Sequence, residues 1–188
     1  LGGQAAGSSA GRRVIDIEKD SLCILASSLA AIDDTFALFT FNSSGPNKVY
    51  FNVVKDFHER WDQNAQRRIA SIRPFESNRD GCAIRHANAR LARRPEKTKL
   101  LLLLSDGIAA DVDYGVDAGM NASKYAIEDT RRAIQESREL GIVPFCLTID
   151  SRAKDYIARL YGSYRYALLD DVGSLPERLS KLYLRLTG

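Results

Sequence analysis

No apolar run in this sequence is long enough to cross a membrane. The longest, Leu100 to Leu104, has the length of one strand, whereas a membrane-spanning helix needs about 20 apolar residues. The chain has no secretory signal at its start and does not begin with methionine, so we expect it to be part of a longer protein. These absences argue against a membrane-spanning protein.

Cysteine is scarce as well. The three cysteines, Cys23, Cys82 and Cys146, are far apart and form no CxxC pair. An odd number of cysteines within apolar patterns is typical of reduced, buried thiols in a cytosolic protein. A cysteine nucleophile is the alternative, but only His58 and His86 could act as its base, so we prefer the first interpretation.

The common catalytic and nucleotide-binding motifs are also missing. The sequence contains no GxGxxG, GxxxxGK[ST], GxSxG or HExxH, which excludes the chemistry that each of these motifs supports. No other pattern pairs a nucleophile with a base. We therefore predict that the chain is not itself an enzyme.

The charge pattern gives no support for nucleic-acid binding. The formal net charge is +3, and both signs are interspersed along the chain. A basic stretch runs from Arg85 to Lys99, but no aromatic residues are interleaved with its charges. We interpret it as the exposed face of a helix and its loop, and we expect no nucleic-acid partner.

The hydrophobic pattern predicts an α/β fold. Residues 1–11 are rich in Gly, Ala and Ser and are expected to form a flexible loop, and residues 12–188 to form one domain. Alternating strands and helices indicate βαβ units and a parallel sheet covered on both faces, with an antiparallel edge strand from a hairpin. Helices are expected at 14–29, 59–72, 81–93, 123–140, 156–160 and from 174 onward, and strands at 36–41, 49–54, 99–104, 142–149 and 164–169.

Acidic residues follow several of the expected strands. Asp106, Asp150 and Asp170 come where buried strands end, and Asp80 precedes the helix at 81–93. Ligands of open α/β sheets bind beyond the carboxyl ends of the strands, and Mg²⁺ prefers oxygen ligands. We favour a functional role for Asp106, a turn or cap role for Asp150 and Asp170, and leave Asp80 open between ligand and cap.

The loop that contains Asp106, Asp111, Asp113 and Asp117 is acidic enough to suggest calcium. It lacks the glycine and the terminal glutamate that an EF-hand requires. We therefore interpret it as a solvated loop.

Several blocks of sequence, in the same order, resemble one family. Leu101–Gly107 is similar to the fourth-strand signature of von Willebrand factor A (VWA) domains. Further blocks resemble the carboxy-terminal domain of the NorD family of nitric oxide reductase activation proteins, whose relative CbbO, a rubisco-activase adaptor, shares the pattern. The similarity extends from about Arg12 to Thr187. These further blocks are Arg12–Lys19, Ala83–Ala87, Tyr125–Thr130, Pro144–Asp150, Tyr166–Asp171 and Leu175–Leu179.

The resemblance implies a three-layer αβα, Rossmann-like VWA fold. It also implies a cytoplasmic adaptor for a MoxR-type AAA+ ATPase. The ATPase would supply the work, and the VWA domain would contact a client enzyme, such as a nitric oxide reductase or a rubisco-like client, that is activated or matured.

VWA domains commonly carry a metal-ion-dependent adhesion site, which a carboxylate of the partner completes. Its ligands are an Asp-x-Ser-x-Ser motif after the first strand, a Thr or Asp in a second loop, and an Asp after the fourth strand. The resemblance assigns the last position to Asp106. The second loop reads Asn78-Arg79-Asp80-Gly81 where the family often has Thr-Arg-Met-Gly. This version resembles cobaltochelatase-type VWA domains and implies that Asp80 and Asn78 help to hold Mg²⁺, or Mn²⁺ or Ca²⁺.

The first adhesion-site motif is not found in this chain. No Asp-x-Ser-x-Ser and no apolar strand precede the helix at Val14, and Ser8 and Ser9 lie in a glycine-rich segment without an aspartate. We expect the corresponding segment to be missing from the chain.

Two other functions remain open. One is a metal-dependent enzyme, for phosphoryl transfer or of receiver type, that uses the acids at the strand ends. The other is a VWA subunit of a cobalt or magnesium chelatase, which the Asn78–Gly81 loop suggests.

Overall fold

Two compact units make up the chain. Unit 1 contains helices α1 and α2, and unit 2 contains α3, α4, α5 and strands β3, β4 and β5. The β1–β2 hairpin is divided between them, with its turn, Phe41–Phe51, in unit 2. The computed structural model describes residues 14–73, 77–105, 107, 109–115, 119, 121–148, 156–162, 165–168, 177, 181 and 183.

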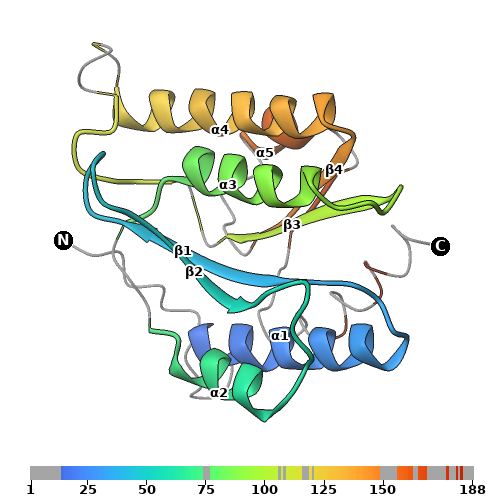
Figure 1. Ribbon diagram of the computed structural model, residues 1–188. Coiled ribbons are helices and arrows are strands. Elements are labelled where there is room, and N and C mark those ends of the chain that lie inside the picture. The colour runs from blue at the N-terminus through green and yellow to red at the C-terminus, as the bar shows by residue number, and fades with distance from the viewer. Residues whose placement is uncertain are drawn as a thin grey trace. The chain divides into compact units, whose positions relative to one another are not determined.

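In unit 1, α1 (Val14–Ala31) is amphipathic, as the sequence predicts. Its buried positions recur three or four residues apart, with one adjacent pair, which places them on one face of the helix. The helix ends just before Asp33, whose φ of 55° is in the left-handed region that stops a helix. The buried positions are Ile17, Ser21, Leu25, Ala26 and Leu29. In Figure 1, α2 lies beside α1.

Helix α2 (Gln63–Ser71) is shorter than the predicted helix at 59–72. Asp62 is its N-cap, because its carboxylate accepts a hydrogen bond of 2.9 Å from the Ala65 amide. Such a cap defines the start of a helix, so Trp61 lies outside it. The predicted helix at 59–72, which included Trp61, was therefore wrong at its start.

The predicted hairpin is present. Strands β1 (Leu38–Ser43) and β2 (Val49–Lys55) form a two-stranded sheet. The first strand lies two residues later than predicted. The turn between them includes Gly45, whose φ of 79° favours glycine.

Unit 2 contains a parallel sheet in the order β3–β4–β5. Strand β3 (Lys99–Ser105) pairs along its whole length with β4 (Ile142–Thr148), and β4 pairs with β5 (Tyr166–Leu168). The α/β fold with parallel strands is therefore confirmed. The helices of this unit are α3 (Asp80–Ala92), α4 (Ala122–Glu139) and α5 (Ile157–Tyr161).

Helices α3 and α4 lie side by side and run in the same direction (Figure 1). Apolar side chains from these helices, from α5 and from the sheet pack into one core. Helix α4 ends where predicted, because Gly141 adopts a φ of 72°. The buried members of the core are Ile84, Leu103, Ala133, Ile134, Cys146, Ile157, Leu160 and Tyr161.

Strand β3 departs from the prediction of a fully buried strand. Of its five consecutive leucines only Leu103 is buried, and the others are half-buried. The reason is the position of the strand, because β3 is the outer member of the described sheet of unit 2 and has one paired neighbour there.

Within the described residues, no helix is long and apolar enough to cross a membrane. The predicted helix beginning at 174 falls largely on positions outside the described residues, as does the end of the strand at 142–149.

Candidate functional site

Two of the three predicted metal ligands lie together at the start of α3. Asp80 is the first residue of the helix and is 5% exposed. The side-chain amide of Asn78 donates a hydrogen bond of 2.9 Å to Asp80 Oδ1. The third predicted ligand, Asp106, lies outside the described residues, as do Asp150 and Asp170.

Asn78 also joins the start of α3 to the loop that follows β3. Its backbone amide donates to the Ala110 carbonyl at 3.0 Å, and the Ala110 amide donates to Asn78 Oδ1 at 3.2 Å. The loop before α3 and the loop after β3 are thus held together beyond the carboxyl end of β3. We refer to residues 77–80 and 109–115 together as the rim.

Asp111 corrects the prediction that the acidic loop is solvated. Its side chain is 0% exposed and accepts a hydrogen bond of 2.7 Å from Arg79 Nε. The amides of Gly45, in the hairpin turn, and of Val112 also donate to this carboxylate, at 3.0 and 2.7 Å. Asp111 therefore connects the hairpin turn, the start of α3 and its own loop.

The surroundings of Asp111 keep it ionised. Burial alone would raise the pKa of its carboxyl. The Gly45 amide, the Arg79 guanidinium and the Val112 amide favour the charged form more strongly, so the pKa lies below its ordinary value. The ion pair with Arg79 is therefore present at neutral pH.

Tyr114 extends these contacts toward α4. Its ring is 2% exposed and lies under the Arg79 guanidinium, 4.4 Å from ring centroid to Cζ. Its hydroxyl donates a hydrogen bond of 2.7 Å to Asp129 Oδ2 on α4. Burial, with the nearby Asp129 carboxylate, raises the pKa of Tyr114 well above its ordinary value. The phenol is therefore a hydrogen-bond donor at neutral pH.

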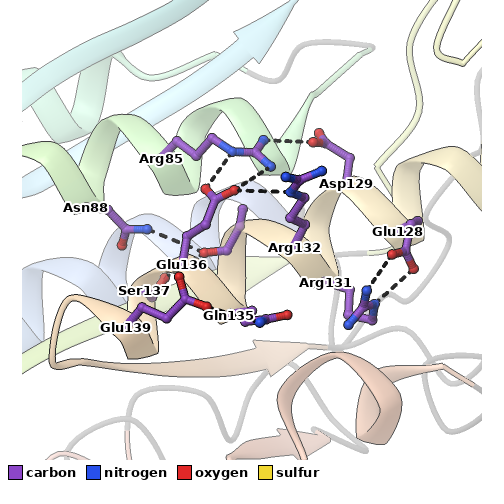
Figure 2. Close-up of polar contacts among 11 residues, drawn as sticks. Arg85, Asn88, Glu128, Asp129, Arg131, Arg132, Gln135, Glu136, Ser137 and Glu139 are labelled. Atoms are coloured by element: carbon purple, nitrogen blue, oxygen red, sulfur yellow. Dashed lines mark hydrogen bonds and ion pairs between the residues drawn. The ribbon is translucent and has the colours of Figure 1, made fainter.

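Arg85 is an exception within the basic stretch that was predicted to be an exposed face, whereas Arg93 and Lys97 are exposed as predicted. Figure 2 shows its guanidinium between Asp129 and Glu136 of α4. Its NH1 donates to Asp129 Oδ1 and its Nε to Glu136 Oε2, each at 2.7 Å. Arg132 approaches Glu136 as well, at 3.7 Å. Arg85, Asp129 and Glu136 are partly exposed, and Arg132 is exposed. The two ion pairs of Arg85 therefore orient α3 against α4 more than they stabilise the fold.

Gly81 allows the carboxylate of Asp129 to lie against the first turn of α3. A Cβ at position 81 would overlap that carboxylate. Because hydrogen bonds from Tyr114 and Arg85 hold Asp129 in place, a side chain at position 81 would break at least one of them.

The donor atoms at the rim fit a hard cation in kind. The Asp80 carboxylate and the Asn78 amide oxygen are oxygen ligands of the type that Mg²⁺ and Ca²⁺ prefer. The part of the chain that the structure describes contains no group of three or more His, Cys, Asp or Glu side chains placed to hold a metal. A metal held here would therefore need donors beyond Asn78 and Asp80.

The cysteines are free thiols but are not uniformly buried, contrary to the prediction. Cys146 is buried, Cys23 is half-buried and Cys82 is exposed. Burial is the largest cause that raises the pKa of each thiol above its ordinary value. A protonated thiol is a poor nucleophile, so the pKa values oppose cysteine catalysis.

Solved structures share the fold of this chain. Proximal thread matrix protein 1 from the mussel byssus superimposes on 90% of this chain with a TM-score of 0.64 at 12% sequence identity. The match includes 41% of the mussel protein's chain. The same mussel protein, with a zinc-occupied MIDAS motif, matches with a TM-score of 0.63 at 13% identity. MIDAS denotes the metal-ion-dependent adhesion site. At this identity the similarity concerns the fold alone.

Sequence comparison identifies the family. Residues 59–184 match the family described as the cobalamin biosynthesis protein CobT VWA domain, and the chain belongs to this family. The chain is 40% identical over 177 residues to NorD of Brucella melitensis and 36% identical over 159 residues to NorD of Stutzerimonas stutzeri. It is also 44% identical over 175 residues to an uncharacterized protein of Pseudomonas aeruginosa.

The matches to the B. melitensis, S. stutzeri and P. aeruginosa proteins include 94%, 85% and 93% of this chain, respectively. They include only 27%, 25% and 28% of the relatives. It thus spans about a quarter of each relative. It is a VWA domain that resembles part of NorD, which confirms the interpretation from the sequence.

Proposed function

We propose that this chain is the protein-binding VWA module of a NorD-like adaptor rather than an enzyme. In this proposal the adaptor works in the cytoplasm with a MoxR-type AAA+ ATPase and presents a client enzyme, such as a nitric oxide reductase or a rubisco-like protein, for activation. Membership of a VWA family and 36–40% identity to NorD proteins support it. The free thiols with raised pKa values agree with a reducing compartment and with a non-catalytic role.

The observation that carries the binding site in this proposal is the junction at Asn78. This residue holds the Asp80 carboxylate and also the loop that follows β3. Asp106, Asp80 and Asn78 would hold a divalent metal, Mg²⁺ first and Mn²⁺ or Ca²⁺ as alternatives, and a partner carboxylate would bind it. The metal would supply a positive charge with an exchangeable ligand position.

Metal binding and partner capture test the proposal together. Because the chain spans only about a quarter of its relatives, the full-length protein serves as the wild type in these tests. Its Mn²⁺ binding is measured by calorimetry and compared with that of Asp80→Asn and Asp106→Ala variants. Capture of a MoxR-type ATPase with its client is measured with Mg²⁺ and with EDTA. We expect both substitutions to abolish Mn²⁺ binding and capture. Asp113→Asn is the matched control, because Asp113 is an exposed acid of the same loop with a φ of 59°, which asparagine tolerates. Capture that is equal in EDTA would contradict a metal-dependent site.

A chelatase subunit is the second candidate, because the matching family is named after a cobalamin biosynthesis protein. The Asn78–Gly81 loop is the feature of the chain that supports it. Recovery of a chelatase catalytic subunit in the capture experiment, in place of a reductase or rubisco-like client, would favour this candidate.

A further inference from the structure

The side chain of Arg79 joins the two segments of the rim. Its Nε donates to Asp111 Oδ2 and its NH2 donates to the Val112 carbonyl, both at 2.7 Å. Its guanidinium also covers the ring of Tyr114. Together with the Asn78–Ala110 hydrogen bonds, these contacts join residues 78–79 to 110–114. We call Arg79, Asp111, Val112 and Tyr114 the Arg79 clamp.

The ion pair of the clamp is buried, with side-chain exposures of 9% for Arg79 and 0% for Asp111. Removing two charges from water is costly, so such a pair contributes little net stability compared with apolar side chains of similar size. The pair does, however, impose one geometry, because the planar guanidinium requires Asp111 and the Val112 carbonyl at defined positions.

The clamp also affects the charge of the rim. Arg79 lies between Asn78 and Asp80 in the sequence, and a guanidinium has donors but no acceptor atom, so it cannot coordinate a metal. A bare positive charge next to those residues would repel a divalent cation. The Asp111 carboxylate compensates this charge at 2.7 Å.

We propose that Arg79 and Asp111 are positioning residues for the binding site at the rim. They hold the Asn78–Asp80 segment and the loop at 109–115 in the arrangement that a divalent cation and a partner require, and Asp111 compensates the positive charge of Arg79. This inference rests on the proposed metal-dependent binding, and neither residue is itself a ligand.

Arg79→Lys tests the clamp and leaves Asn78 and Asp80 in place. Lysine keeps the charge but lacks the planar fork that contacts Asp111 and Val112 together. We expect the affinity for Mn²⁺, measured by calorimetry, to fall about tenfold or more, which is the usual effect of losing a partner that orients metal ligands. Arg131→Lys is the matched control, because Arg131 pairs with Glu128 on the exposed face of α4 (Figure 2), and it should bind Mn²⁺ as the wild type does.

Amide hydrogen exchange separates positioning from unfolding. In Arg79→Lys we expect the amides of Asn78, Ala110 and Val112 to exchange at least about tenfold faster, while those of β4 keep their protection. If Arg79→Lys loses protection throughout, Asp111→Asn replaces it as the test, because it removes the charge with almost no change of shape. The same loss of affinity is expected. Because Asp111→Asn also destabilises unit 2, exchange should accelerate more at the amides of Asn78, Ala110 and Val112 than at those of β4.

The results distinguish this inference from the proposed function. If the wild type binds Mn²⁺ and Asp80→Asn abolishes binding, but the clamp variants bind as tightly as the wild type, the clamp is overturned and the metal site stands. If the wild type binds no Mn²⁺, or Asp80→Asn binds it normally, the metal site is refuted and the clamp has no site to position.

Discussion

Replacing Asp111 with asparagine should destabilise unit 2 far more than its location in an acidic loop suggests. The substitution removes a carboxylate that is 0% exposed and leaves the Arg79 guanidinium, 9% exposed, without its counter-charge. Removing one partner of a buried ion pair costs about 3–5 kcal/mol.

Two features of the structure place the expected loss at or slightly below the lower end of that range. The asparagine oxygen can still accept from the Gly45 and Val112 amides, and Arg79 keeps its hydrogen bond to the Val112 carbonyl and its contact with Tyr114. We therefore expect the free energy of unfolding to fall by about 2–3 kcal/mol.

Urea unfolding followed by circular dichroism measures this change. Glu128→Gln is the control, because it breaks an exposed ion pair. The side chains of Arg131 and Glu128 in this pair are 45% and 54% exposed, respectively. Such a surface pair contributes less than about 1 kcal/mol. If Asp111→Asn costs no more than this control, the reasoning about burial is wrong.

A double-mutant cycle isolates the ion pair. Arg79→Met removes the charge that Asp111→Asn leaves unpaired, so the double variant should be less destabilised than the sum of the single ones by at least about 1 kcal/mol. Additive effects would show that Asp111 acts through its amide contacts alone.

Three further predictions concern the same unit. Gly115→Ala should lower the free energy of unfolding in urea by about 2–4 kcal/mol, because φ is 88° and the new Cβ would overlap Tyr125. Gly141→Ala is the comparison: its φ of 72° is similar but the new Cβ would meet open space, so the free energy of unfolding should fall by only about 1 kcal/mol. Gly81→Ala should displace Asp129 and cost about 1–3 kcal/mol, and an unchanged unfolding midpoint would contradict this. Because the pKa of Asp111 is lowered, the ionised carboxylate stabilises the fold fully above the ordinary carboxyl pKa range, and this stabilisation is lost as the pH falls through and below about 4. The difference in the free energy of unfolding between wild type and Asp111→Asn should therefore shrink at low pH.

The regular elements could largely be predicted because their signals are local. Helix α1 follows from apolar residues that recur near the 3.6-residue period of a helix, and the end of α4 follows from Gly141. The error at the start of α2 is local as well. An aspartate such as Asp62 can cap a helix or lie within it, and here its hydrogen bond to the Ala65 amide makes it the cap. The leucines of β3 predicted full burial, because the sequence does not show which strand is outermost in a sheet.

The candidate site was predicted in part. The positions of Asn78 and Asp80 before a helix placed them at the rim, and the structure brings them together. Asp111 was missed because its amide and ion-pair partners, Gly45 and Arg79, are 66 and 32 residues away in the sequence. An aspartate in a loop with three others has the same local pattern whether it is solvated or buried.

The charged residues for which the prediction failed share one physical property, because each charge is compensated by a residue distant in the sequence. Asp111 is compensated by Arg79, and Arg85 by Asp129 and Glu136. A charged side chain leaves water only where such a partner meets it, so these pairs lie where segments of unit 2 are joined. Among them, only the Asp111–Arg79 pair is almost fully buried and also adjoins the residues predicted to bind a partner. The cost of burying it is therefore best explained by the arrangement that it imposes on the rim.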